Sequence, residues 1–446
     1  MSADIRIVGA TAIVASPTRV LWDAEIALSP STGLITYLGP NRGPIGPGDI
    51  SAVGRIVAPG LINGHTHAGI SLLRGHSDDA PLQEWLTHIR AFEVLMTRDD
   101  IRAGLLLSMA EMIRTGTVGF LDMFAWDSGL LADVRSAGLR VQAAPAVFGY
   151  DAVAYPRAST QTGSQALDET PRLAAEFAGD ELISVSYAIH APYSCGPELM
   201  ADVARRSAGN GIGVQIHLSE TAAEVANSLT TYGRSPIALA ADLGLLAGRL
   251  HVAHAVHPEP GDIDLLASAP GVTVSHNPIS NLKLGAGIAP IPDYLRAGVA
   301  LAVGTDSMAS NNSADLFEEI KMAALLQRGV HHDPALVSGI DTLTMATSGG
   351  ARALGGGLSG RLAEGQAADL ILLDTAGPTG TPMTNPVAFL SYAARGGDVT
   401  DVFVAGRRLL ADRVLTTLDE SAIRADAAAR VRRIRAELPP DPAGPQ

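Results

Sequence analysis

Short apolar runs alternate with helix-like stretches through most of this sequence, and the alternation limits the possible fold more than any other feature. Eight runs have the length and composition of buried strands: IVAPGLIN, TVGFLDM, LRVQAAPAVF, LISVSYAIHA, GVQIHLS, LHVAHAV, VTVSHNP and ALAVGTDS. Helix-like stretches lie between several of them, at residues 98–115, 197–210 and 314–327. Parallel strands joined by helices form α/β folds, and eight such units close into a barrel. We therefore predict an α/β fold built on a (β/α)8 barrel of the TIM type.

Both ends of the chain have a different pattern, in which short β-type runs are separated by Pro, Gly and Ser turns. IRIVGATAIVAS, LWDAEIALSP and GLITYLGP precede the barrel, and GRLAEGQAADLILLD and DVFVAGRRLLADRVL follow it. Neither end can bury a core alone, so we predict one small β-sandwich made from residues 1–56 and 356–436. The barrel then spans residues 57–355, and the proline-rich residues 437–446 are predicted to be a disordered tail.

Composition excludes several classes of partner. The chain has 446 residues and a formal net charge of -14, which disfavours binding to nucleic acid or to an anionic membrane. No apolar stretch approaches the roughly 20 residues of a membrane helix, and the first residues lack the pattern of a signal peptide. Cys195 is the only cysteine, so no intrachain disulfide can form. We expect a cytoplasmic protein that acts on a small molecule.

Two histidines, His65 and His67, follow the first predicted barrel strand with one residue between them. Side chains at positions i and i+2 of a strand point to the same face, so the two imidazoles would converge on one spot. Such a pair can bind a divalent metal, although two ligands do not complete a site. The alternative is a pair of surface histidines in a loop.

Further polar residues stand at the ends of later strands. His190 ends the fourth strand, His217 and then Glu220 follow the fifth, His254 lies in the sixth, and Asp306 ends the eighth. Functional groups of a barrel gather at the carboxyl ends of its strands. Each residue alone could be an ordinary polar group, but together with the two histidines of the first strand they indicate an active site.

The chain resembles the amidohydrolase superfamily, and within it the branch of 5′-methylthioadenosine/S-adenosylhomocysteine deaminases and chlorohydrolases. The resemblance rests on HTHAGISLLRG, EWL, HAPYSC, HLSET, AHAVH, SHNPISNLKLGAGIAPIP, GTDSMASNN and FEEIKMAALLQ. It implies metal ligation by His65, His67, His217 and Asp306. Two-metal members place a bridging carboxylated lysine where this chain has His190, so the resemblance implies one metal, zinc first, with Fe2+ or Mn2+ as alternatives.

The resemblance also implies a reaction, the hydrolytic release of ammonia from an aminated heterocycle by a metal-activated water. The expected substrate is an adenine nucleoside of the adenosine, 5′-deoxyadenosine, 5′-methylthioadenosine or S-adenosylhomocysteine type. Glu220 would protonate the ring nitrogen, His254 would act as a general base toward the water, and Asp306 would pass a proton to the leaving amine. His190 would hydrogen-bond the substrate ring or the developing tetrahedral centre.

Residues that would bind the substrate are matched less closely. Glu93 corresponds to a glutamate that binds ribose hydroxyls in the nucleoside deaminases of this branch, and Trp85 either flanks the base or fills the core. The methylthioadenosine-type deaminases hold the far end of their substrate with arginines after the third strand. This chain lacks the first of them, and Arg157 could replace the second. Ser307 could also face the pocket, the alternative being an ordinary loop serine.

Three other interpretations stay open at this point. The first is an s-triazine or pterin amino- or chlorohydrolase with the same mononuclear metal chemistry, which release of chloride rather than ammonia would reveal. The second is amide hydrolysis by a two-metal centre, and the third is a non-catalytic binding protein on the same fold. Glu220 and His254 favour loss of an amine, because expelled ammonia must be protonated. Many relatives are homo-oligomers, so we expect one here.

Overall fold

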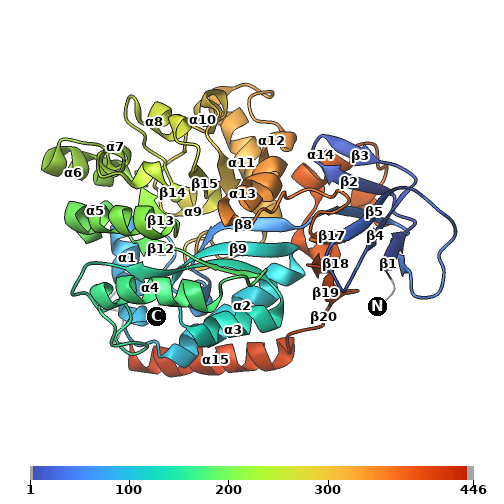
Figure 1. The fold of residues 1–446 in the computed structure, drawn as a ribbon. Coiled ribbons are helices and arrows are strands. Elements are labelled where there is room, and N and C mark those ends of the chain that lie inside the picture. Colours follow the sequence, from blue (N-terminus) through green and yellow to red (C-terminus); the bar gives the residue numbers. More distant parts are fainter. Residues whose placement is uncertain (1–3, 439–446) are drawn as a thin grey trace.

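A curved parallel sheet forms the centre of the protein in the computed structural model, which describes residues 4–438 (Figure 1). The first and last strands meet at one rim, where the backbone N–H of Asp306 donates to the carbonyl of His65 at 2.9 Å. The strands in spatial order are β8 (Leu61–Thr66), β9 (Thr117–Phe124), β10 (Arg140–Val147), β12 (Tyr187–Ile189), β13 (Val214–Leu218), β14 (Leu250–His254), β15 (Val272–His276) and β16 (Leu301–Val303), with β11 (Ile183–Val185) also paired to β10. The predicted (β/α)8 barrel is confirmed.

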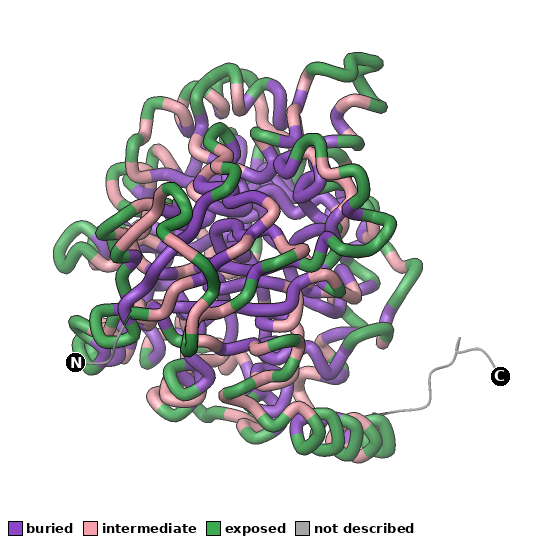
Figure 2. The backbone as a smooth tube through the Cα atoms, turned by 90° about the vertical axis from the view of Figure 1, so that its right-hand side faces the viewer, coloured by how far each residue is buried: buried purple, intermediate pink, exposed green. Residues whose placement is uncertain are grey.

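The barrel strands are buried because helices cover their outer face. All eight residues of β9 are buried, as expected for a parallel strand enclosed on both sides. Buried backbone occupies the middle of the molecule in Figure 2, and exposed backbone lies mainly at its periphery. Because both faces of these strands are buried, their sequences are uninterrupted apolar runs and do not alternate between apolar and polar residues.

Helices connect the strands. Several of them begin at a side-chain cap, as α2 does at Thr97 and α6 at Thr221. The helices are α1 (Leu82–Glu93), α2 (Arg98–Arg114), α3 (Ser128–Ala137), α4 (Gly163–Glu176), α5 (Pro192–Asn210), α6 (Ala222–Tyr232), α7 (Pro236–Asp242), α8 (Asp262–Ser268), α9 (Pro278–Lys283), α10 (Ile291–Ala297), α11 (Leu316–His331), α12 (Gly339–Thr344), α13 (Gly350–Leu354), α14 (Pro386–Ala388) and α15 (Glu420–Glu437), and a short 3-10 segment, η1 (Ala68–Leu73), follows β8. No helix within residues 4–438 is both long and apolar enough to cross a membrane.

Strands from both chain ends form two further sheets beside the barrel. One has the order β5 (Ile35–Pro40), β4 (Ala24–Leu28), β1 (Ile5–Val8) and β6 (Ile50–Ser51); the other has the order β20 (Val414–Leu415), β19 (Arg407–Ala411), β18 (Val399–Val404), β17 (Leu370–Asp374), β7 (Arg55–Pro59), β2 (Ala12–Ser16) and β3 (Arg19–Leu21). Ile7, Ile26, Leu370 and Phe403 share one apolar cluster that draws on both sheets. These sheets lie in the chain segments that we assign to the sandwich, while the domain boundaries themselves stay predictions.

The run IVAPGLIN forms two strands where the sequence predicted one. β7 pairs with β17 beside the barrel, and β8 begins the barrel itself. Gly60 separates them, and a Cβ there would lie 2.2 Å from a methyl carbon of Val118. The chain therefore crosses from one sheet to the other at a residue that has no room for a side chain.

The C-terminal segment also contains a long helix that the sequence analysis did not anticipate. α15 packs along α2, where Arg430 and Arg433 bind the buried carboxylate of Asp100. Of the predicted disordered tail, Glu437 lies in this helix, and residues 439–446 lie outside the described residues.

Candidate active site

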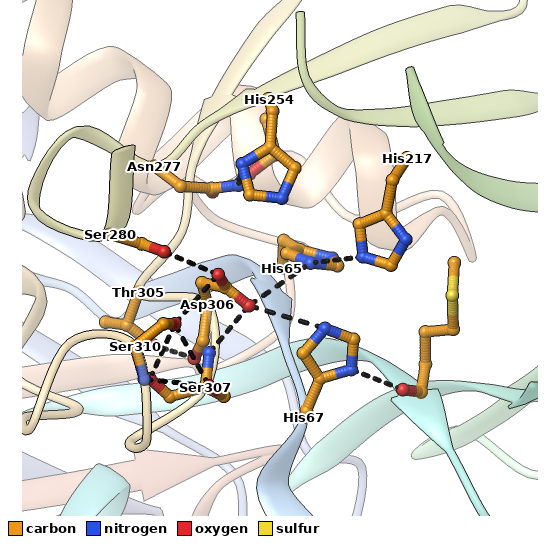
Figure 3. A network of polar contacts seen from close by, with 12 residues as sticks. His65, His67, His217, His254, Asn277, Ser280, Thr305, Asp306, Ser307 and Ser310 are labelled. Atoms are coloured by element: carbon orange, nitrogen blue, oxygen red, sulfur yellow. Dashed lines mark hydrogen bonds and ion pairs between the residues drawn. The ribbon is translucent and has the colours of Figure 1, made fainter. Parts of the chain in front are cut away.

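Three histidines meet at the carboxyl ends of two barrel strands. His65 and His67 come from the end of β8 and His217 from β13, and their candidate ligand nitrogens all lie within 4.8 Å of one another. Nε2 of His65 lies 3.2 Å from Nε2 of His217 and 3.6 Å from Oδ1 of Asp306 (Figure 3). Four donors from three distant parts of the chain therefore converge on one point.

Backbone carbonyls fix which nitrogen of these imidazoles is available. Nδ1 of His67 lies 2.5 Å from the carbonyl of Met123, and Nδ1 of His217 lies 2.6 Å from the carbonyl of His190. A carbonyl can only accept, so each Nδ1 carries a proton and each Nε2 keeps its lone pair. Burial and neighbouring histidines hold the pKa of His65 and of His217 well below the ordinary value. Neutral imidazoles of this kind are metal ligands.

Asp306 is held by hydroxyl and amide donors of the surrounding loops. Its Oδ2 accepts from the hydroxyls of Ser280 at 2.6 Å and Ser310 at 2.9 Å, and its Oδ1 accepts from the backbone N–H of Ser307 at 2.7 Å. The same Oδ1 lies 3.3 Å from Nε2 of His67. Three nitrogens and one carboxylate oxygen form a donor set that zinc accepts, so the residues present fit a metal ion.

The backbone at this rim adopts conformations that most residues avoid. Ser219, His254 and Asp306 have φ angles of 53°, 73° and 59°. Such left-handed conformations cost on the order of 1–3 kcal/mol each for a non-glycine residue and gather at functional sites. Ser219 directly follows β13, His254 ends β14, and Asp306 lies in the loop after β16.

We call His65, His67, His217 and Asp306 the donor cluster, because their side chains offer the atoms that could bind a metal. Glu220 and His254 lie beside this cluster and are not part of it. Nε2 of His254 is 3.9 Å from Oε1 of Glu220, and Nδ1 of His254 is 2.9 Å from Oδ1 of Asn281. Burial raises the pKa of Glu220. Burial alone would lower the pKa of His254, but the carboxylates of Glu220 and Asp306 raise it above its ordinary value. Both pKa values are raised and the two groups lie close together, an arrangement that suits proton exchange between them.

A cavity of about 580 Å³ opens onto these groups, and its size is typical of a small-molecule site. His190 lines it, and burial lowers the pKa of that imidazole to about 3. Trp85 and Glu93 line it from α1, and Glu93 faces Arg90 at 3.5 Å. Burial raises the pKa of Glu93. The structure thus brings both α1 residues to the same cavity as the donor cluster.

Two predicted substrate-binding residues lie elsewhere. Arg157 does not line the cavity, and its guanidinium pairs with Glu437 at the end of α15. Ser307 is fully buried behind Asp306, where its hydroxyl lies 3.0 Å from that of Ser310. The structure therefore does not bring either side chain to the cavity: the first pairs with Glu437 at the surface, and the second lies beside Ser310 behind Asp306. A part for either in substrate binding stays a prediction.

Sequence reasoning missed several residues that the site uses. Asp122 lies near the end of β9 and accepts from the backbone N–H of Ala68, next to His67, at 2.5 Å; burial raises its pKa to about 6. Ser280 and Asn281 lie within the motif SHNPISN, so a search for polar partners of the ligands could have found them. Tyr155 lines the cavity but follows a loop that carries no motif.

Comparison with known proteins agrees with this geometry. The sequence model of the amidohydrolase family matches residues 56–409. The chain belongs to the amidohydrolase family. The 5-methylthioadenosine/S-adenosylhomocysteine deaminase of Syntrophobacter fumaroxidans is 42% identical over 371 residues, which cover 82% of this chain and 83% of the relative. The 5′-deoxyadenosine deaminase of Methanothermobacter thermautotrophicus is 38% identical over 386 residues, covering 85% and 88%.

Two solved structures superpose over nearly the whole chain. An adenosine deaminase from Xanthomonas campestris with bound zinc has a TM-score of 0.91 and 33% identity, and the match covers 97% of this chain and 99% of that one. The atrazine chlorohydrolase of Arthrobacter aurescens complexed with zinc has a TM-score of 0.86 but 24% identity, covering 96% and 100%. The second likeness shows the fold alone.

Proposed function

We propose that this protein is a hydrolytic deaminase of an adenine nucleoside, and that His65, His67, His217 and Asp306 hold one zinc ion. The proposal rests mainly on one observation: the donor cluster shares a cavity with two acid–base residues that are not among the proposed ligands, Glu220 and His254. The names of the deaminase relatives at 38–42% identity support the substrate class. Ammonia release from an adenine ring is the chemistry that uses all these groups together.

His65, His67, His217 and Asp306 would hold a divalent metal, which would lower the pKa of a bound water and so provide a nucleophile at neutral pH. The two imidazoles are oriented for metal binding, because backbone carbonyls fix the protonated Nδ1 atoms of His67 and His217 and leave each Nε2 free to bind. Zinc is the first expectation, and Fe2+ or Mn2+ would accept the same ligands.

Glu220 is proposed to protonate the ring nitrogen next to the carbon that is attacked. Attack breaks the aromaticity of the ring, and protonation of that nitrogen relieves the charge that develops there. Glu220 suits this role because it lines the cavity and its raised pKa favours the protonated carboxyl. His254 lies 3.9 Å away and can return a proton to the Glu220 carboxylate.

His254 is proposed to accept the proton of the attacking water. Its Nδ1–H donates to Oδ1 of Asn281, which leaves Nε2 as the accepting atom toward the cavity. Asp306 would then relay the remaining proton of the added hydroxyl to the departing amine, so that the C–N bond breaks and ammonia leaves as a neutral molecule. His190 would hydrogen-bond the ring or the tetrahedral centre, and Glu93 would bind the ribose hydroxyls.

The test is ammonia release by zinc-loaded protein from adenosine, 5′-deoxyadenosine, 5′-methylthioadenosine and S-adenosylhomocysteine, with a pterin and aminated or chlorinated triazines alongside. We expect ammonia from at least one adenine nucleoside, and a Glu220→Gln variant that keeps its zinc but loses roughly 10²–10⁴-fold in turnover. Turnover of a triazine or pterin with no nucleoside activity would reject the proposal. Near-normal activity of Glu220→Gln would remove Glu220 from the mechanism.

Two further expectations stay predictions. We propose a cytoplasmic location and a homo-oligomeric assembly, each of which fits the small-molecule chemistry proposed for the site. Fractionation of cell extracts and light scattering of the purified protein test them. A monomer at micromolar concentration would reject the second.

A further inference from the structure

A row of aromatic rings lines the cavity and begins beside the donor cluster. The ring of His190 lies 5.2 Å from that of His217 and stacks on Phe148, with centroids 4.4 Å apart and planes inclined by 27°. Phe148 meets Tyr155 edge-on at 6.4 Å, and Tyr155 contacts Phe124 at 4.3 Å. All four residues of this aromatic row, His190, Phe148, Tyr155 and Phe124, line the cavity.

Helix α1 adds a second apolar surface to the same cavity. Leu82, Trp85 and Ile89 are buried on one face of the helix and line the cavity. Nε1 of Trp85 donates to the carbonyl of Ala309 at 3.3 Å, so its polar atom is engaged and its rings are left for packing. A bound molecule therefore meets aromatic and aliphatic carbon on more than one side.

Charged groups are scarce on this lining and already engaged. Apart from the histidines, the charged residues are Arg90, Glu93, Glu220 and Asp306. Glu220 and Asp306 already have proposed roles in the reaction. Arg90 donates to the carbonyl of Ala154 at 2.5 Å and lies 3.5 Å from Glu93. Because Ala154 precedes Tyr155, Arg90 anchors the segment that carries the aromatic row.

We propose that the cavity selects adenine nucleosides with an apolar 5′ substituent and discriminates against an aminocarboxylate end, such as that of S-adenosylhomocysteine. This inference rests on the proposed function, which places the adenine ring at the donor cluster and the 5′ group along the aromatic row. A zwitterionic end needs a partner for each of its charges, and a buried charge without one is strongly disfavoured. An alkyl or aryl group needs only the apolar contacts that the row offers.

The experiment compares kcat/KM of the zinc-loaded wild type for five substrates that differ only at the 5′ position: adenosine, 5′-deoxyadenosine, 5′-methylthioadenosine, 5′-phenylthio-5′-deoxyadenosine and S-adenosylhomocysteine. We expect 5′-methylthioadenosine to exceed adenosine by about 10-fold or more, since one apolar group in a fitted pocket is worth about 10- to 200-fold. The phenylthio compound should be at least as good, and S-adenosylhomocysteine at least about 10-fold worse than 5′-methylthioadenosine on the same scale.

Tyr155→Ala tests the aromatic row directly, and Tyr155→Phe is its matched control because it keeps the ring. The ratio of kcat/KM for 5′-methylthioadenosine to that for adenosine should fall toward unity in Tyr155→Ala and stay near the wild-type ratio in Tyr155→Phe. Melting curves and zinc content establish that both variants are folded. The wild-type comparison decides the matter without them if Tyr155→Ala does not fold.

Each outcome has a distinct meaning. Equal or better turnover of S-adenosylhomocysteine or adenosine than of 5′-methylthioadenosine overturns the inference and leaves the deaminase proposal intact. A selective loss of S-adenosylhomocysteine turnover in Arg90→Gln would also overturn it, because Arg90 would then bind the carboxylate. Absence of ammonia from all five compounds rejects the proposed function itself.

Discussion

Two parts of the cavity are held in place in different ways. We call the proposed metal ligands His65, His67, His217 and Asp306 the rim, and the aromatic row together with the apolar face of α1 the wall. At the rim, strand ends and backbone carbonyls fix the ligands, as Met123 does for His67 and His190 does for His217. The wall comes mainly from α1 and the loop after β10, with Phe124 from β9. Arg90 joins α1 to that loop at Ala154, and Trp85 joins α1 to Ala309 in the loop after β16. The rigid rim suits the chemical step, and the wall suits discrimination between substrates.

The sharpest way to break this comparison is to remove one ligand from the rim. His217→Ala should lower bound zinc below one per chain and reduce turnover by roughly 10³-fold or more, because the activated water is lost. Metal analysis and the ammonia assay measure the two effects. His331→Ala, on the exposed end of α11, is the matched control. Full zinc content in His217→Ala would show that the cluster is not the metal site.

A smaller effect is expected from the hydroxyls that hold Asp306. Ser280→Ala removes a 2.6 Å hydrogen bond to Oδ2 and leaves the bond from Ser310 in place. Loss of such an outer partner usually weakens metal binding by roughly 10- to 100-fold. Competition with a chromogenic chelator measures the change, and Ser136→Ala, at an exposed position of α3, controls for the substitution itself. An unchanged affinity would mean that the Ser310 hydroxyl and the backbone N–H of Ser307 suffice to position the carboxylate.

A substitution in the wall should have a smaller effect than one in the rim, and it should change KM more than kcat. Trp85→Phe keeps an aromatic ring but removes the bond to Ala309, a neutral hydrogen bond worth about 1 kcal/mol, or about fivefold. We expect KM for the nucleoside to rise by about that factor with a smaller change in kcat, because the lost bond joins Trp85 to Ala309 and not to a proposed metal ligand. Steady-state kinetics check this. A fall in kcat larger than the rise in KM would place α1 in the chemical step.

The last prediction concerns Glu319 on α11, which supports the rim from behind. It accepts from the backbone N–H of Ile279 and from the amide of Asn311, next to Ser280 and Ser310. Burial raises the pKa of Glu319 to about 8, above its ordinary value of 4.5. Between these pH values the folded protein keeps a proton that the unfolded chain releases. Stability from this group is therefore present at low pH and is lost as the pH rises toward 8.

Melting temperatures from pH 5 to pH 8 measure this dependence. The fall in Tm with rising pH should be smaller in Glu319→Gln than in the wild type, because the amide does not titrate. Glu318→Gln, at the exposed neighbouring position, should behave as the wild type does. Identical slopes in the wild type and Glu319→Gln would show that the buried carboxyl does not hold its proton.

The sequence predicts the rim well because strand ends are local features. His65, His67, His217 and Asp306 each follow an apolar run, and the barrel topology alone brings such ends together. The split of the first run at Gly60 was missed, because the sequence does not reveal which of two sheets a short strand joins. α15 was missed because little of it is buried, namely Ile423, Ala427 and Ile434.

The wall could not be predicted in the same way. Arg157 was assigned to the substrate because its position in the chain resembled that of a family arginine, yet its partner Glu437 lies 280 residues away. Tyr155 and Phe148 are brought together by a loop with no periodic pattern. Loop conformation depends on tertiary bonds such as that of Arg90 to Ala154, and these are not encoded in local spacing.

The most direct test of the central claim is a zinc titration of chelator-stripped protein, with ammonia release from 5′-methylthioadenosine as the readout. The account predicts that activity is absent without metal, rises linearly and saturates at one zinc per chain, and that His217→Ala shows no such rise. Full activity of the stripped protein, or saturation only at two equivalents, would contradict a single metal centre at His65, His67, His217 and Asp306.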